Sequence, residues 1–147
     1  MQIKDFDVTK VMFHRQPMLL VDRILEENGN SGKASFLIKK DCIFLDENGF
    51  VLRPALIEMA AQALAAVDGY QKRREKKSSL QGFLVSVKNF EFYSDAKEND
   101  LVICAIEKID EFANMHMVKV KTFVNDTLIA EGELRIFEIT DKNVWKL

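Results

Sequence analysis

The amino-acid sequence predicts an α+β fold in which an antiparallel sheet of five to seven strands wraps around one long helix. Two observations predict this arrangement. The segment from Pro54 to Val67 is apolar on nearly all sides, which is typical of a helix buried inside a domain. Much of the chain after this segment alternates apolar and polar side chains, which is typical of half-buried strands. A sheet that curves around a helix is the simplest way to cover that helix on most sides.

The helix is expected to run from Ala55 to Asp68. Ala, Leu, Met and Gln favour helices, and neither Gly nor Pro interrupts this segment. Pro54 suits the first helical position, and Gly69 suits the end of the helix. The residues that follow, 71–79, are basic and polar, and we interpret them as a connection whose positive charges the helix dipole favours. A docking patch for an acidic partner is the alternative interpretation.

Strands are predicted on both sides of the helix. The two candidates before it are expected to pair around a turn rich in Asn and Gly. The last two candidates alternate apolar and charged side chains, and they are expected to form a hairpin with Asn125 and Asp126 in its turn. The strand candidates are residues 18–25, 33–38, 82–92, 101–109, 116–124 and 128–136.

Glu58 is a single carboxylate in the most apolar stretch of the chain. Burying an ionised carboxylate costs several kcal/mol unless the group is paired, hydrogen-bonded or protonated. Proton transfer is the commonest functional reason for such a residue. Gln62, four residues later, lies on the same face of the helix. The structural alternative is that Glu58 bonds to a backbone N–H group or to Arg53 and only fixes the helix.

Length and composition limit the classes of function. The 147 residues form one domain, 1–147, with the 48% hydrophobic and 30% charged residues typical of soluble globular proteins. The formal net charge of -2 gives no reason to expect nucleic acid as a partner. The N-terminal residues lack the features of a leader, and no apolar run approaches the length that spans a bilayer. We therefore expect a cytoplasmic protein without a membrane partner.

The chain has two cysteines, Cys42 and Cys104, and neither lies near a second Cys or a His at metal-ligand spacing. We expect both to be reduced thiols packed as small apolar residues. We expect no metal and no cofactor.

Four segments resemble those of a known family. Residues 13–25, Phe-His-Arg-Gln-Pro-Met-Leu-Leu-Val-Asp-Arg-Ile-Leu, are similar to the N-terminal signature of the beta-hydroxyacyl-acyl-carrier-protein dehydratases (FabZ/FabA-like), His-Arg-x-Pro-x-Leu-Leu-Val-Asp-Arg. Residues 54–62, Pro-Ala-Leu-Ile-Glu-Met-Ala-Ala-Gln, resemble that family's helix motif, in which a Glu precedes an Ala-Gln pair. Residues 82–92 and 129–134 also match in order and spacing. The short loop before the helix is similar to a divergent, aryl-polyene-type branch.

The resemblance implies a hotdog fold, a dimer in which two sheets join edge to edge, and removal of water from a 3-hydroxyacyl thioester carried on acyl carrier protein. In such an enzyme a base takes a proton from C2 and an acid protonates the departing C3 hydroxyl. Glu58 matches the family's catalytic Glu. The resemblance also implies that Ala55 and Leu56, at the helix N-terminus, and Gln62 bind the substrate. Met59 and Phe83 are candidates for lining an acyl tunnel, although core packing is their ordinary role.

The family's loop His is missing. Members of the family have Gly-His-Phe-Pro before the helix, and the resemblance implies that this His and the helix Glu come from opposite subunits. Counting back from Pro54 places Asp46 at the His position, whereas counting back from Glu58 places Phe44 there. Asp46 is therefore the candidate partner of Glu58, in a pair of carboxylates that share a proton.

The chain contains two histidines. His14 lies in the N-terminal signature, where the resemblance implies a positioning role and not that of the base. His116 falls on the apolar side of its strand, and we expect a core or edge histidine with a satisfied hydrogen bond.

Three functions remain open at this point. The first is a 3-hydroxyacyl-carrier-protein dehydratase in fatty-acid or polyene-type synthesis, with Glu58 as the acid. The second is a non-catalytic subunit that binds the acyl thioester and works with an active hotdog dehydratase. The third is a hotdog thioesterase, in which a helix carboxylate activates water without any His. The expected assembly is a homodimer or a heteromer with a second hotdog protein.

Overall fold

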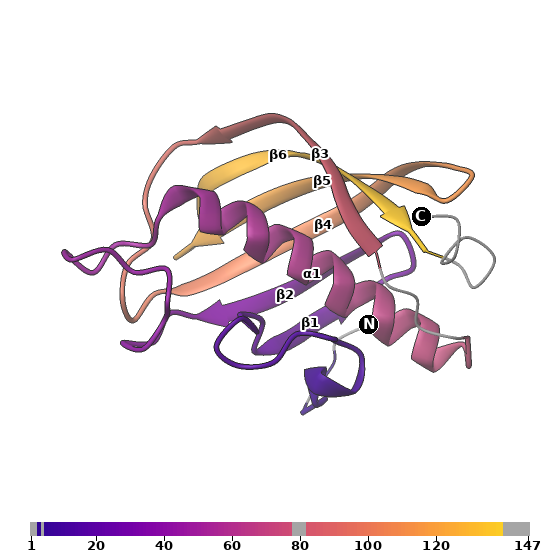
Figure 1. The fold of residues 1–147 in the computed structure, drawn as a ribbon, viewed down its shortest axis with the longest axis horizontal. Helices are drawn as coiled ribbons and strands as arrows, with labels where there is room; N and C mark the ends of the chain where they lie inside the picture. The colour runs from indigo at the N-terminus through magenta and orange to yellow at the C-terminus, as the bar shows by residue number, and fades with distance from the viewer. Residues whose placement is uncertain (1–2, 4, 78–81, 140–147) are drawn as a thin grey trace.

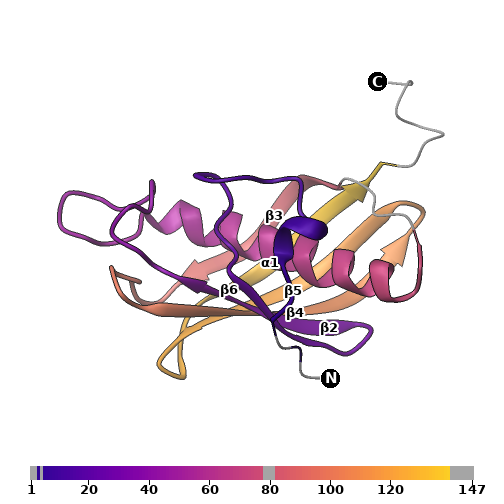
Figure 2. The same cartoon turned by 90° about the horizontal axis from the view of Figure 1, so that it is seen from below.

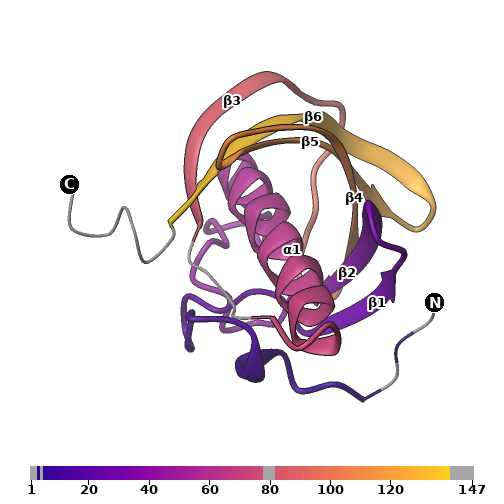
Figure 3. The ribbon, with the colours of Figure 1, turned by 90° about the vertical axis from the view of Figure 1, so that its right-hand side faces the viewer.

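The computed structural model describes residue 3, residues 5–77 and residues 82–139. In this part of the chain one long helix lies across the concave face of an antiparallel sheet of six strands (Figure 1). The strands stand in the order β1-β2-β4-β5-β6-β3, and the sheet curls around the helix when it is viewed from the end (Figure 3). The predicted α+β architecture is confirmed. The elements are η1 (Val8–Lys10), β1 (Arg23–Glu27), β2 (Ser31–Leu37), α1 (Arg53–Arg74), β3 (Gly82–Phe92), β4 (Leu101–Phe112), β5 (Met115–Val124) and β6 (Thr127–Glu138).

The core lies between α1 and the concave face of the sheet. Leu56, Met59 and Val67 of the helix are fully buried, together with Phe36 of β2 and Leu134 of β6. The helix is therefore covered on most of its circumference, as its apolar sequence predicts. Among the described residues, no helix is both long and apolar enough to cross a membrane.

The helix does not end at Gly69, as the sequence predicts, but continues to Arg74. Gly69 has a different role, because it allows the N-terminal segment to pack closely on the helix. A Cβ atom at this position would lie 2.8 Å from Val11 Cβ and 3.0 Å from Val11 O. The segment that precedes β1 runs along the helix at this point (Figure 2).

We expect the substitution Gly69→Ala to destabilise the protein. Replacing Gly by Ala inside a helix normally stabilises it by about 1 kcal/mol. Here the new methyl group would meet Val11, and forcing extra volume into a packed contact costs about 1–3 kcal/mol. The net change should therefore be destabilising, which urea unfolding would measure. A stabilised variant would show that the N-terminal segment moves aside without cost.

The predicted hairpin is confirmed, since β5 and β6 pair with Val124 opposite Thr127. Its turn residues Asn125 and Asp126 have φ angles of 49° and 62°. Positive φ at both turn positions is typical of two-residue hairpins, and Asn and Asp tolerate it well.

The N-terminal pair of strands is confirmed, but β1 begins later than expected. The sequence predicts a strand from residue 18, whereas β1 begins at Arg23. The backbone before it has other partners: the N–H group of Leu20 donates to Oε1 of Gln62 on the helix, at 2.9 Å. A helix side chain therefore holds the middle of this segment, and the bonding to β2 begins at Asp22, whose N–H group donates to the carbonyl oxygen of Ser35 at 2.9 Å.

Candidate functional site

A cavity of about 300 Å³ lies between α1, the N-terminal segment and the start of β3. Glu58, Ala61, Ala65 and Asp68 line it from the helix. Residues three and four apart share one face of a helix, so these positions form a single stripe. Because two of them are alanines, the stripe leaves space above the helix. Met12, Phe83, Leu84 and Ile136 are among the residues that complete its wall.

Glu58, His14 and Gln62 form one end of the cavity. Nε2 of Gln62 donates to Oε1 of Glu58 at 2.9 Å and to the carbonyl oxygen of Met18 at 2.8 Å. Nε2 of His14 lies 3.6 Å from the same Oε1 atom. The side chains of His14 and Glu58 are 37% and 35% exposed, so both can meet a ligand in the cavity. The end therefore offers a carboxyl group and an imidazole side by side.

The alternative in which Glu58 pairs with Arg53 does not hold in this structure. Nε of Arg53 instead donates to Oδ1 of Asp95, at 2.8 Å. The Glu58 carboxyl group therefore keeps an amide and an imidazole as its neighbours, without a guanidinium group.

Arg15 fixes the backbone that carries His14. Its Nη1 atom donates to the carbonyl oxygens of Met12 and His14, at 2.6 and 2.8 Å. Its Nη2 atom donates to the carbonyl oxygen of Thr9 at 3.2 Å. These bonds close the segment into a loop around one guanidinium group, and the loop holds the imidazole at the cavity.

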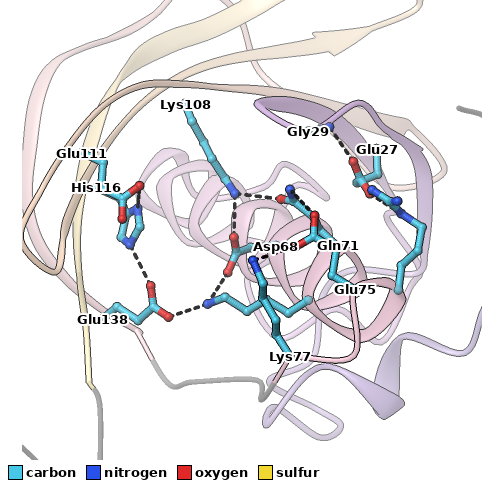
Figure 4. A network of polar contacts seen from close by, with 12 residues as sticks. Glu27, Gly29, Asp68, Gln71, Glu75, Lys77, Lys108, Glu111, His116 and Glu138 are labelled. Atoms are coloured by element: carbon cyan, nitrogen blue, oxygen red, sulfur yellow. Dashed lines mark hydrogen bonds and ion pairs between the residues drawn. The ribbon is translucent and has the colours of Figure 1, made fainter. Parts of the chain in front are cut away.

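A network of charged side chains forms the opposite end of the cavity (Figure 4). Asp68 accepts from Lys72 and Lys108, at 2.8 and 2.6 Å. Glu138 accepts from Lys72 at 2.5 Å and contacts Nε2 of His116 at 2.7 Å. Glu58 and Asp68 are separated by about 15 Å along the helix axis. The cavity thus has two polar ends and an apolar middle.

The ion pairs of this network determine two pKa values. Burial alone would raise the pKa of Asp68, but Lys108 and Lys72 outweigh it and hold the pKa below its ordinary value. Burial alone would lower the pKa of Lys72, but Asp68 and Glu138 outweigh it and raise the pKa. The network therefore favours the charged form of both groups.

The lowered pKa of Asp68 predicts a loss of stability in acid. A carboxyl group with a depressed folded-state pKa contributes stability that is present above the unfolded value, about pH 4, and is lost as the pH falls through the folded value. Urea unfolding at about pH 6 and about pH 3 should show a smaller loss for Asp68→Asn than for the native protein. The exposed Glu47 supplies the control variant, Glu47→Gln. Equal losses in the native protein and Asp68→Asn would contradict the prediction.

The structure places the candidate site residues in three groups. Glu58, Gln62 and Phe83 line the cavity. Ala55, Leu56 and Met59 are buried in the core, and the N–H group of Ala55 donates to the carbonyl oxygen of Leu52 at 2.9 Å. Their assignment to substrate binding stays a prediction.

Asp46 forms the third group, away from the cavity. It is exposed, and its Oδ1 atom accepts from the N–H groups of Asn48 and Phe50, at 2.8 and 3.0 Å. Within one chain it is therefore a turn residue. The pairing with Glu58 across two subunits stays a prediction.

The sequence predicts only a positioning role for His14, whereas the structure places its imidazole beside Glu58 in the cavity. Its position in the N-terminal signature gives no distance to Glu58, because the segment reaches the helix only through tertiary contacts such as Leu20 to Gln62. His116 is half-buried with Glu138 as its partner, as expected, but it also lines the cavity.

Within the described ranges, no group of three or more His, Cys, Asp or Glu residues could hold a metal ion. Burial raises the pKa of the Cys104 thiol to about 12, so this residue is an unreactive part of the core.

Comparison with solved structures identifies the fold. The dehydratase heterocomplex ApeI:P from Xenorhabdus doucetiae matches with a TM-score of 0.89 and 16% identity, over 97% of each chain. A hypothetical thioesterase with coenzyme A from Streptococcus pneumoniae matches with a TM-score of 0.63 and 11% identity, over 80% of this chain and 84% of that one. At these identities the likeness shows the fold alone. The architecture is that of a hotdog protein, as the resemblance implies.

Comparison with families and curated relatives gives the class. The 3-hydroxyacyl-[acyl-carrier-protein] dehydratase FabZ of a Nitratiruptor species is 28% identical over 144 residues, which cover 92% of this chain and 97% of that protein. The family model of ApeP-like proteins, described as ApeP dehydratase, matches residues 6–146. The chain belongs to the ApeP-like dehydratase family, a divergent branch of the FabZ-like hotdog dehydratases.

Proposed function

We propose that this protein removes water from 3-hydroxyacyl thioesters carried on acyl carrier protein. The observation that supports the proposal best is the position of Glu58, which stands at one end of a largely apolar cavity with its oxygen held by Gln62. The apolar middle of the cavity suits a fatty acyl chain, with polar groups at the ends to orient the substrate. Membership of a dehydratase family agrees with this chemistry. We place the reaction in the cytoplasm, in fatty-acid or polyene-type synthesis.

Glu58 is the general acid in this proposal. Its carboxyl group donates a proton to the C3 hydroxyl, which leaves as water, while a base removes a proton from C2. The acyl tail then lies over Ala61 and Ala65, whose small side chains leave space above the helix. The hydrogen bond from Gln62 Nε2 fixes which Glu58 oxygen stays available to the substrate.

We also infer that the protein works as a dimer or as a heteromer with a second hotdog protein. Strand β3 stands at the edge of the sheet, so its outer side has no paired strand among the described residues. It exposes apolar side chains, with Phe83, Leu84 and Val85 between 41% and 55% exposed. An unpaired apolar edge favours addition of another strand. The structure from Xenorhabdus doucetiae is a heterocomplex, which supports a partner of the same fold.

The test is an assay with 3-hydroxybutyryl carrier protein, with and without a second hotdog dehydratase. The proposal predicts the conjugated enoyl thioester, seen by mass spectrometry of the carrier protein. Formation of the product only after the partner is added, together with an unaffected rate for Glu58→Gln, would identify a non-catalytic binding subunit. Release of the free thiol of the carrier protein without enoyl product would identify a thioesterase.

A further inference from the structure

The loop before the helix offers no obvious residue that could act as the base and remove the C2 proton. The loop before the helix has no His, and its Asp46 is exposed and bonded to its own turn. Of the two histidines in the sequence, His116 lies at the opposite end of the cavity and contacts Glu138 at 2.7 Å. His14 is therefore the imidazole that this chain places beside Glu58.

The two nitrogens of His14 differ in their surroundings. Nδ1 is buried and has no hydrogen-bond partner among the described residues. Because the side chain is 37% exposed and lines the cavity, Nε2 is the nitrogen that a ligand can reach. Nε2 is also the nitrogen that lies nearest to Glu58.

The separation of 3.6 Å between His14 Nε2 and Glu58 Oε1 leaves Nε2 free to act, and Glu58 keeps Oε2, the oxygen that Gln62 does not hold, for the substrate. This distance is longer than an ordinary hydrogen bond, so the two side chains do not bond to each other. The atoms on which a dehydratase acts, the C2 hydrogen and the C3 hydroxyl, are carried by neighbouring carbons. Two groups side by side at one end of the cavity can therefore reach the C2 hydrogen and the C3 hydroxyl of one bound substrate at the same time.

Both groups are held in place before any substrate binds. The guanidinium group of Arg15 holds the carbonyl oxygens of Met12 and His14, and Gln62 holds Glu58. Groups fixed in advance need no reorganisation during the reaction, which is the arrangement expected of a catalytic pair.

We propose that His14 is the general base and that it acts on the same substrate molecule as Glu58 of its own chain; this inference rests on the proposed function. The step begins with a neutral His14 imidazole and a protonated Glu58 carboxyl group. Nε2 of His14 takes the C2 proton, and the electron pair of that C–H bond forms the double bond between C2 and C3. The C3–O bond breaks with its electrons, and the Glu58 proton completes the water molecule. Proton transfer from the imidazolium to the Glu58 carboxylate then restores the pair.

The test uses the variants His14→Ala and His14→Gln in whichever form of the protein, alone or with its partner, makes the enoyl product. Both should lower kcat/KM by about 10²–10⁴-fold, the usual contribution of a general base. Added imidazole should restore part of the activity of His14→Ala, because it can occupy the vacated space and accept a proton. The same variants should stop incorporation of solvent deuterium at C2. Thermal unfolding would establish that both variants fold.

The outcomes separate this inference from the proposed function. If no form of the native protein makes the enoyl product, the proposed function itself fails. If the native protein is active and Glu58→Gln is not, a His14→Gln variant with a nearly native rate overturns the inference alone. A His14→Gln variant that has lost dehydration but still exchanges deuterium at C2 also overturns it. In either case, inactive Asp46→Asn with active Glu47→Gln would assign the base to the loop carboxylate.

Discussion

The substitution Glu58→Gln should abolish formation of the enoyl thioester, with a fall in kcat/KM of about 10²–10⁴-fold. The amide has nearly the shape of the carboxyl group but cannot donate a proton to the C3 hydroxyl. Its Oε1 atom can still accept the hydrogen bond that Gln62 gives to Glu58 at 2.9 Å. The fold, and with it the melting temperature, should therefore stay close to that of the native protein.

The control for Glu58→Gln is the same chemical change at Glu47, which lies exposed on the loop before the helix. Rates with 3-hydroxybutyryl carrier protein would be compared at saturating and at low substrate concentration. A fall in kcat, and not only a rise in KM, is expected because the acid acts in the transition state. A Glu58→Gln variant with a native kcat would remove Glu58 from the chemistry.

The substitution Ala65→Phe should shorten the acyl chain that the protein accepts. Ala65 lies on the helix stripe that lines the cavity, about one turn beyond Ala61 and about two turns beyond Glu58 in the direction of Asp68. A phenyl ring there would fill the apolar middle, whereas the end formed by His14 and Glu58 would stay open. Substrates with short tails should therefore react nearly as before.

The size of the effect follows from the apolar surface that the tail buries. An octanoyl chain has four more methylene groups than a butyryl chain, and each buried one contributes about 0.8 kcal/mol. Losing them costs about 3 kcal/mol, or about 10²-fold in kcat/KM. The ratio of kcat/KM for 3-hydroxyoctanoyl and 3-hydroxybutyryl carrier protein measures this effect, with Ala65→Ser as the control of small size. An unchanged ratio would mean that the tail lies elsewhere.

Most of the fold could be predicted from the sequence, because local patterns decide it. The all-round apolar helix and the alternating strands indicate the layers, and Asn125 and Asp126 locate the last hairpin. The end of the helix could not be predicted in this way. Gly69 resembles a helix terminus in the sequence, and only its contact with Val11 reveals a packing role. Tertiary packing outweighs local preference at this position.

The candidate site could be predicted only in part, for the same physical reason. Glu58 stands out because a lone acid in an apolar helix is costly. His14 could not be linked to Glu58, since the link is a long-range one made through Gln62 and the loop around Arg15. The charged network of Asp68, Lys72 and Glu138 joins distant segments, and strand alternation alone gives no indication of it.

The buried amide of Gln62 has a wider consequence. It bonds to Met18 and Leu20 of the N-terminal segment and to Glu58 of the helix. One side chain thus serves both as an anchor for a stretch of backbone and as a support for the proton donor. A substitution of Gln62 would therefore change both tasks at once. A mutation that loosens the N-terminal segment would also change the support of the proton donor.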